Sequence, residues 1–126
     1  MRLRALRGAT TAERDAPEAV VAATEKLLEE LLARNDVRPE DLVSIIFTAT
    51  PDLTSEFPAA AARRLGISHI PLLCAVEIGV NGAPPRCVRV LIHLYTDRDH
   101  EDLRHVYLGD ARQLRTDLLE REPEEL

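Results

Sequence analysis

Two arginines, Arg7 and Arg89, lie in the middle of predicted strands, where apolar side chains would be expected. With a side-chain period of two, Arg7 belongs to a face that is otherwise made by Leu3, Ala5 and Ala9. Arg89 has a valine on each side in the strand that begins at Cys87. Because a guanidinium cannot lose its charge, and burying it unpaired is costly, both side chains require anionic partners from the protein or from a ligand.

One such arginine alone is more often a structural ion pair, or a side chain whose charged end reaches solvent. Two of them on adjoining strands favour a different interpretation. A third cation, Arg63, lies on the same predicted helix as Phe57 and faces it. Together these residues predict a pocket for a small ligand that carries two negative charges.

Glu77 closes the apolar run that contains Cys74, and two interpretations of this carboxylate stay open. It could accept a hydrogen bond from a ligand hydroxyl, or it could pair with one of the arginines. Cys74 is more typical of a small core residue than of a reactive thiol. Tyr107 and the preceding His105 are ambiguous on their own. The four histidines lack metal-ligand spacing and no nucleophile triad is present, so no cofactor or metal is predicted.

The elements that must position these residues begin with a strand over 2–13, followed by a helix. Asp15 has the residue type and position of a helix N-cap, with Pro17 in the first turn. Apolar residues at helical spacing then predict an amphipathic helix over 16–34, which ends at Asn35.

A β-branched run predicts a buried strand over 43–50. Thr54 or Ser55 is expected to cap a shorter second helix, and Gly66 has the position of a C-terminal glycine. Further elements are predicted as strands over 70–78 and 87–95, a polar turn over 97–102 and an extended piece over 106–108. This order indicates an α/β (α+β) fold, a mixed β-sheet with helices on one face.

Length and charge restrict the class of protein. The 126 residues suit one compact domain, which we place at 1–117, with an acidic and flexible tail at 118–126. Hydrophobic residues make up 45% of the chain but only four are aromatic, so burial between subunits would help this small core. The net charge of -6 argues against a general nucleic-acid binder. No signal peptide or membrane-spanning run is recognisable, so a cytoplasmic location is expected.

Seven segments, in order and at near-constant spacing, resemble the AroH-class chorismate mutases over nearly the whole chain. They are 4–11 (RALRGATT), 48–53 (TATPDL), 57–59 (FPA), 71–74 (PLLC) leading to Glu77, 86–90 (RCVRV), 104–108 (RHVYL) and 114–118 (LRTDL). The resemblance implies an isomerase that rearranges chorismate to prephenate in phenylalanine and tyrosine biosynthesis. It also implies a homotrimer whose sheets form a pseudo α/β barrel, with active sites between neighbouring subunits. A pericyclic rearrangement needs no nucleophile, metal or cofactor.

The resemblance also implies a role for each matching residue. Arg89 would reach the ether oxygen of chorismate, and Arg7 would bind the side-chain carboxylate with Tyr107 beside it. Glu77 and Cys74 would contact the ring hydroxyl. The other implied contacts are apolar walls at Phe57, Ala59 and Leu72, a charge at the cleft mouth from Arg63, and a mobile covering tail that starts at Leu114 and Arg115.

One departure from the family pattern is Ala60, where many relatives carry a charged residue. We expect this change to weaken attraction of the substrate without removing the chemistry. Three alternatives stay open at this point. They are a non-catalytic trimer that binds a small carboxylate, a deaminase of the enamine/imine type, and a structural trimer in which Arg7 and Arg89 pair with Asp or Glu across the subunit interface.

Overall fold

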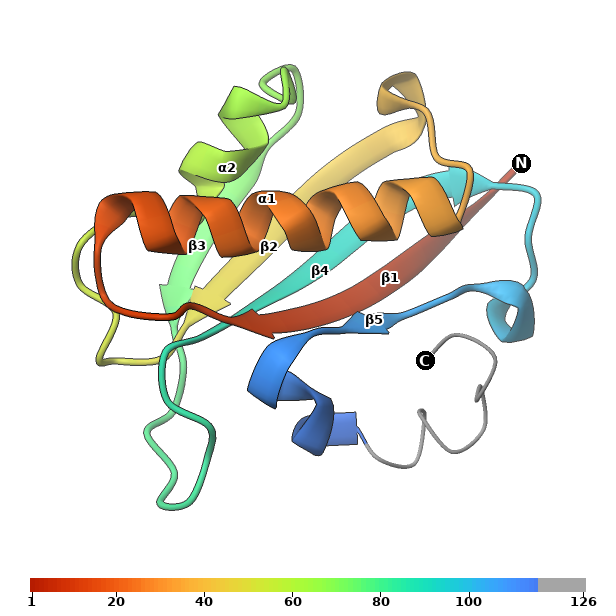
Figure 1. The fold of residues 1–126 in the computed structure, drawn as a ribbon. Coiled ribbons are helices and arrows are strands. Elements are labelled where there is room, and N and C mark those ends of the chain that lie inside the picture. Colours follow the sequence, from red (N-terminus) through yellow and green to blue (C-terminus); the bar gives the residue numbers. More distant parts are fainter. Residues whose placement is uncertain (116–126) are drawn as a thin grey trace.

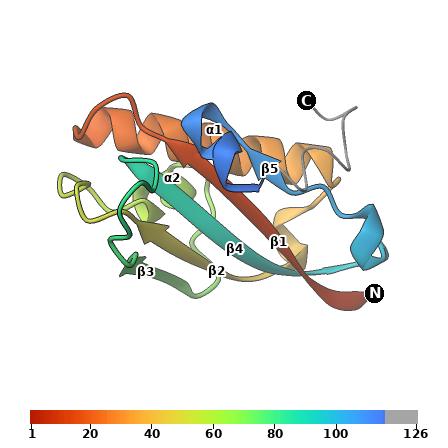
Figure 2. The same ribbon diagram turned by 90° about the horizontal axis from the view of Figure 1, so that it is seen from below.

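The computed structural model describes residues 1–115, so the predicted tail at 118–126 lies outside the described part. Its strands are β1 (Arg2–Thr11), β2 (Leu42–Ala49), β3 (Leu72–Val76), β4 (Cys87–Thr96) and β5 (Val106–Tyr107). They form one sheet in the order β3-β2-β4-β1-β5. Two α-helices, α1 (Pro17–Arg34) and α2 (Ala59–Arg64), lie on the same side of that sheet (Figures 1 and 2).

The sheet is mixed, as predicted. β4 pairs antiparallel with both β1 and β2, whereas β1 with β5 and β2 with β3 are parallel pairs. The strand predicted at 70–78 is shorter, at Leu72–Val76, and the Glu77 N–H still bonds to β2 before the chain enters the loop that leads to β4. Short 3-10 helices complete the described chain: η1 (Pro39–Asp41), η2 (His100–Asp102) and η3 (Gly109–Arg115).

Helix α1 buries an apolar stripe against the sheet, and this packing explains most of its stability. Its buried side chains include Val20, Leu27, Leu28 and Leu31. Gly8 of β1 allows the close approach, because a Cβ there would lie 2.8 Å from the Leu31 Cδ1 atom. The helix ends at its C-cap residue Asn35, as predicted.

Asp15 does not cap α1, contrary to the sequence prediction. The N-cap residue is Ala16, and no side chain caps the helix. The Asp15 carboxylate instead accepts hydrogen bonds from the backbone N–H groups of Thr54 and Ser55, at 3.1 Å each. A local sequence motif cannot reveal this partner, because the two segments meet only in the folded chain. Asp15 therefore fixes the loop before α2.

Helix α2 begins later than predicted, and its N-cap residue is Pro58, without a side-chain cap. The prediction that Thr54 or Ser55 caps it is wrong, because that loop is held by Asp15 instead. Gly66 follows the helix with a φ of +81°, which confirms its expected C-terminal role.

The core fills the space between the helices and one face of the sheet. Its large, fully buried side chains include Leu6, Phe47, Ile92 and Leu94, together with the stripe of α1. We call the opposite face the open face. Among residues 1–115 it is covered at one end, where Ala111 and Leu114 of η3 pack against Ala9, Cys87 and Tyr107. Within the described part, no helix is long and apolar enough to cross a membrane.

Candidate active site

Arg7 and Arg89 lie on the open face, on the adjoining strands β1 and β4. In the β1–β4 ladder, Ala9 is opposite Arg89 and Arg7 is opposite Leu91. Arg7 and Arg89 are therefore diagonal neighbours on one face, within reach of a common small ligand for side chains of this length. The strand pairing, which sequence alone did not give, is what brings them together.

Arg89 forms an ion pair with Glu77, in which 3.1 Å separates Nε of the arginine from Oε1 of the carboxylate. The second carboxylate oxygen, Oε2, accepts a hydrogen bond of 2.6 Å from the Thr48 hydroxyl. Thr48 is directly opposite Arg89 in the β2–β4 ladder. Of the two interpretations left open for Glu77, the structure contains the arginine pair, and the carboxylate is only 14% exposed.

The expected burial of the arginines is not found within one chain. Arg7 is exposed, and 45% of the Arg89 side chain is accessible. The reason is that the helices cover the other face of β1, through Leu6 and Gly8, and leave the Arg7 face open. No carboxylate among residues 1–115 forms an ion pair with Arg7. Its charge thus remains available to a ligand.

Tyr107 is carried to the same face by β5, where it pairs with Ala9. Two side-chain contacts hold this strand. The Arg7 backbone N–H donates to the His105 Nδ1 atom at 3.0 Å. The buried Asn35 side chain holds both backbone groups of Arg104, donating to its carbonyl at 2.9 Å and accepting from its N–H at 2.8 Å. His105, ambiguous in the sequence, thereby helps to align β5 with β1.

The start of β4, and with it the register of Arg89, is fixed by residues of the 48–53 segment. The Thr50 hydroxyl accepts a hydrogen bond of 2.9 Å from the Cys87 N–H. The Asp52 carboxylate accepts one of 2.8 Å from the Arg86 N–H. The Thr50 hydroxyl and this N–H, with the Arg86 charge, hold the pKa of Asp52 below its ordinary value.

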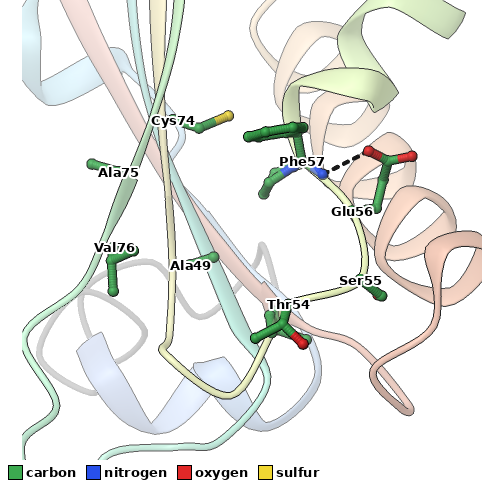
Figure 3. Close-up of a pocket in the computed structure, with 10 residues that line it drawn as sticks. Ala49, Thr54, Ser55, Glu56, Phe57, Cys74, Ala75 and Val76 are labelled. Atoms are coloured by element: carbon green, nitrogen blue, oxygen red, sulfur yellow. Dashed lines mark hydrogen bonds between the residues drawn. The ribbon is translucent and has the colours of Figure 1, made fainter.

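A separate cleft lies beside the edge strand β3, between that strand and the segment that leads into α2. Its volume is about 270 Å³, close to the lower limit of small-molecule sites (roughly 300 Å³). Phe57 and Cys74 point toward each other across it (Figure 3). Glu56 is its one charged lining residue, and the Glu56 carboxylate accepts a hydrogen bond from the Phe57 N–H. The described lining therefore contains no cation for a ligand with two carboxylates.

The predicted site residues fall into two groups on opposite faces of the sheet. Arg7, Arg89 and Tyr107 belong to the open face, and Leu114 packs there, with Glu77 paired to Arg89. Cys74 and Leu72 belong to the helix-covered face, because Cys74 pairs with Phe47 of the core.

Of the remaining predicted contact residues, Ala59 and Arg63 lie outside the lining of the cleft. Ala59 is only 3% exposed and belongs to the core, so it does not line the cleft. Arg63 is exposed on α2 and also lies outside the cleft lining. Leu114 and Arg115 end the 3-10 helix η3, and Leu114 is half-buried.

An open sheet face that carries two arginines and a paired carboxylate is suited, in an α/β protein, to binding a small anionic ligand. The family is more specific. Residues 3–118 match the family model described as Chorismate mutase type I, and the chain belongs to this family.

Individual proteins similar to this chain match it over nearly their whole length. The chain is 49% identical over 117 residues to Chorismate mutase AroH of Thermus thermophilus, covering 92% of this chain and 96% of the relative. It is 43% identical over 119 residues to Chorismate mutase AroH of Bacillus subtilis (strain 168), covering 94% of each. A solved structure of a chorismate mutase from Clostridium thermocellum superimposes with a TM-score of 0.86 at 44% identity, covering 87% of this chain and 98% of that one.

Sequence reasoning missed Thr48 and the residues that precede Phe57 in the cleft. Thr48 belongs to a segment that we had singled out, but only the pairing of β2 with β4 reveals that it faces Arg89. Glu56 carries no periodic signal, because its loop is held by a tertiary contact from Asp15.

Proposed function

We propose that the open face of one subunit and the β3 cleft of its neighbour together form the active site in which this chorismate mutase converts chorismate to prephenate. The single observation that carries this arrangement is the separation of the cations from the cleft. Arg7 and Arg89 lie on one face, whereas Phe57 and Cys74 line a cleft on the other. A di-anionic ligand needs both a cationic and an apolar surface, so a site shared between copies brings the two together.

The open face has the composition of a surface that another subunit covers. Several of its large apolar side chains are exposed, among them Leu3, Leu73 and Tyr95. Several large exposed apolar side chains on one face of a sheet are typical of a surface that binds another subunit. They support a homotrimer, in which each copy covers the open face of the next and desolvates its arginines.

In the proposed site, Arg89 contacts the ether oxygen of chorismate. The C–O bond breaks ahead of C–C formation, so this oxygen gains negative charge in the transition state. A fixed guanidinium in a dry site then stabilises the transition state more than the ground state. The Arg89–Glu77 ion pair supports this role, because it fixes the guanidinium before the ligand binds.

Arg7 binds the side-chain carboxylate in this proposal, with Tyr107 beside it. Holding that carboxylate restrains the enolpyruvyl arm over the ring, in the shape that reacts. The absence of a carboxylate partner for Arg7 among the described residues supports this role, because it leaves the guanidinium of the single chain without a protein counter-ion. Glu77 and the Cys74 thiol or main chain contact the ring hydroxyl. The two unpaired thiols are consistent with the cytoplasmic location that we propose.

The activity is tested by incubating the purified protein with chorismate, following the loss of its ultraviolet band and identifying prephenate as the product. A non-catalytic binding module would bind chorismate without consuming it. An enamine/imine deaminase would instead release ammonia from its own substrates and leave chorismate intact.

The shared site is tested by mixing two inactive variants. Arg89→Ala removes the cationic side of the site, and Phe57→Asp repels the anionic ligand from the cleft of the other subunit. If two copies contribute to each site, randomly co-assembled subunits recover about a quarter of the parent activity, because one site in four combines two intact halves. No recovery above the separate variants would mean that each site lies within one chain.

A further inference from the structure

Thr48 contacts the central ion pair of the proposed site, although no role was assigned to it. Its hydroxyl is 2.6 Å from the Glu77 Oε2 atom and donates a hydrogen bond to it. The residue is half-buried in the middle of the open face. The hydroxyl therefore ends on the carboxylate that also pairs with Arg89.

The backbone holds the three residues in a fixed arrangement. Thr48 of β2 is opposite Arg89 of β4 on one side and opposite Ala75 of β3 on the other. Glu77 continues along β2, because its N–H donates to the Ala49 carbonyl at 2.9 Å. An internal strand of the sheet thus presents the Thr48 hydroxyl to one oxygen of the Glu77 carboxylate, while the other oxygen contacts the Arg89 guanidinium.

We propose that Thr48 is a positioning residue. It holds the Glu77 carboxylate in the orientation that keeps the Arg89 guanidinium directed at the ligand. Thr48 fixes Oε2, and the ion pair engages Oε1 with the Nε atom of Arg89. Without the hydroxyl, the carboxylate can turn about its last side-chain bond and take the guanidinium in a bidentate pair. Such a pair would draw the arginine toward Glu77 and away from the developing charge on the ligand.

This inference rests on the proposed function of Arg89, and it predicts a particular kinetic pattern. An interaction that orients a side chain which contacts the transition state changes kcat more than KM. A hydroxyl that only stabilises the fold would change the midpoint of unfolding and leave both kinetic constants of the folded enzyme unaltered. Thr48 is therefore tested by separating kcat, KM and stability in the same variants.

The test compares Thr48→Val, which keeps the shape and removes the hydroxyl, with Thr48→Ser, which keeps the hydroxyl. Ser44→Ala is the matched control, because Ser44 lies on the same strand and face but bonds to His93 at 3.2 Å instead. We expect Thr48→Val to lower kcat about tenfold, as loss of a hydrogen bond to a charged group does, with KM changed less than about threefold. Thr48→Ser and Ser44→Ala are expected within about twofold of the parent in kcat.

Equal losses of kcat in Thr48→Val and Thr48→Ser would overturn the proposal, as would a Thr48→Val enzyme with the parent kcat. Arg89→Ala, assayed in parallel, separates this result from a failure of the proposed function. An inactive Arg89→Ala enzyme with an unaltered Thr48→Val enzyme refutes only the role of Thr48. An active Arg89→Ala enzyme refutes the role of Arg89 and the role of Thr48 with it.

Discussion

The two faces of the sheet differ in how far a single chain buries their side chains. The helix-covered face is buried within the chain, since Leu6, Phe47 and Ile92 are fully buried beneath α1 and α2. The open face leaves Arg7 exposed and Arg89 partly exposed, and it exposes large apolar side chains beside them. One face contains the buried core of the chain, and the other is the face to which we assign association and chemistry. Substitutions on the two faces should therefore have separable effects.

The largest effect is expected from Arg89→Ala on the open face. The fall in kcat/KM should correspond to a loss of about 3 kcal/mol or more of transition-state stabilisation, as when one oxyanion-type donor is removed. Steady-state kinetics with chorismate measure this loss, and Arg89→Lys should recover only part of it because the planar fork is missing. Activity within tenfold of the parent would refute the role of Arg89.

Leu28→Ala on the helix-covered face should show the opposite pattern. Leu28 is fully buried, and truncating a buried leucine costs about 3 kcal/mol in the free energy of unfolding. Urea unfolding at one fixed protein concentration measures the loss, because assembly couples to stability. The KM of the folded enzyme should stay at the parent value, and a raised KM would contradict the separation of the two faces.

Arg7→Ala, again on the open face, should lower kcat/KM by less than Arg89→Ala does. Because Arg7 is proposed both to bind and to orient the enolpyruvyl arm, kcat should fall and KM should rise together. The combined loss in kcat/KM is expected to be about 2 kcal/mol, as for a hydrogen bond to a charged group. An unchanged KM would count against this residue.

The smallest effect concerns the two thiols. Burial raises the pKa of Cys87 to about 11, and the nearby Glu77 charge adds to this, against the opposing charge of Arg89. At pH 8 Cys87 is thus almost entirely the unreactive thiol, and its reactivity should increase as the pH rises toward that value. A coloured disulfide reagent should rapidly label one thiol per chain, Cys74 of the cleft. Rapid labelling that persists in Cys74→Ser would contradict this assignment.

Local patterns predicted much of the fold. The stripe of α1, the strand alternation and the glycine after α2 depend on neighbouring residues, so sequence alone locates them. The caps failed for the opposite reason. Asp15 has the right type and position for an N-cap, but its partners Thr54 and Ser55 are some forty residues away in the chain.

Sequence alone could nominate residues for the candidate site, but it could not give their arrangement. Period-two alternation placed Arg7 on an apolar face, yet it could not say which face the helices cover. Register is a non-local property, and so the contact of Thr48 with the Glu77 carboxylate emerged only from the paired strands. The split of the predicted site residues between the two faces likewise required the complete strand order.

The strand order also governs the timing of folding during synthesis on the ribosome. β1 is the first strand to leave the exit tunnel, yet both of its neighbours, β4 and β5, begin at residue 87 or later. Until residue 87 has emerged, the nascent β1 can have no partner within its own sheet, and both of its edges stay open to mispairing. Ordered growth of this sheet from the N-terminus is thereby excluded, and its central pairing must close late.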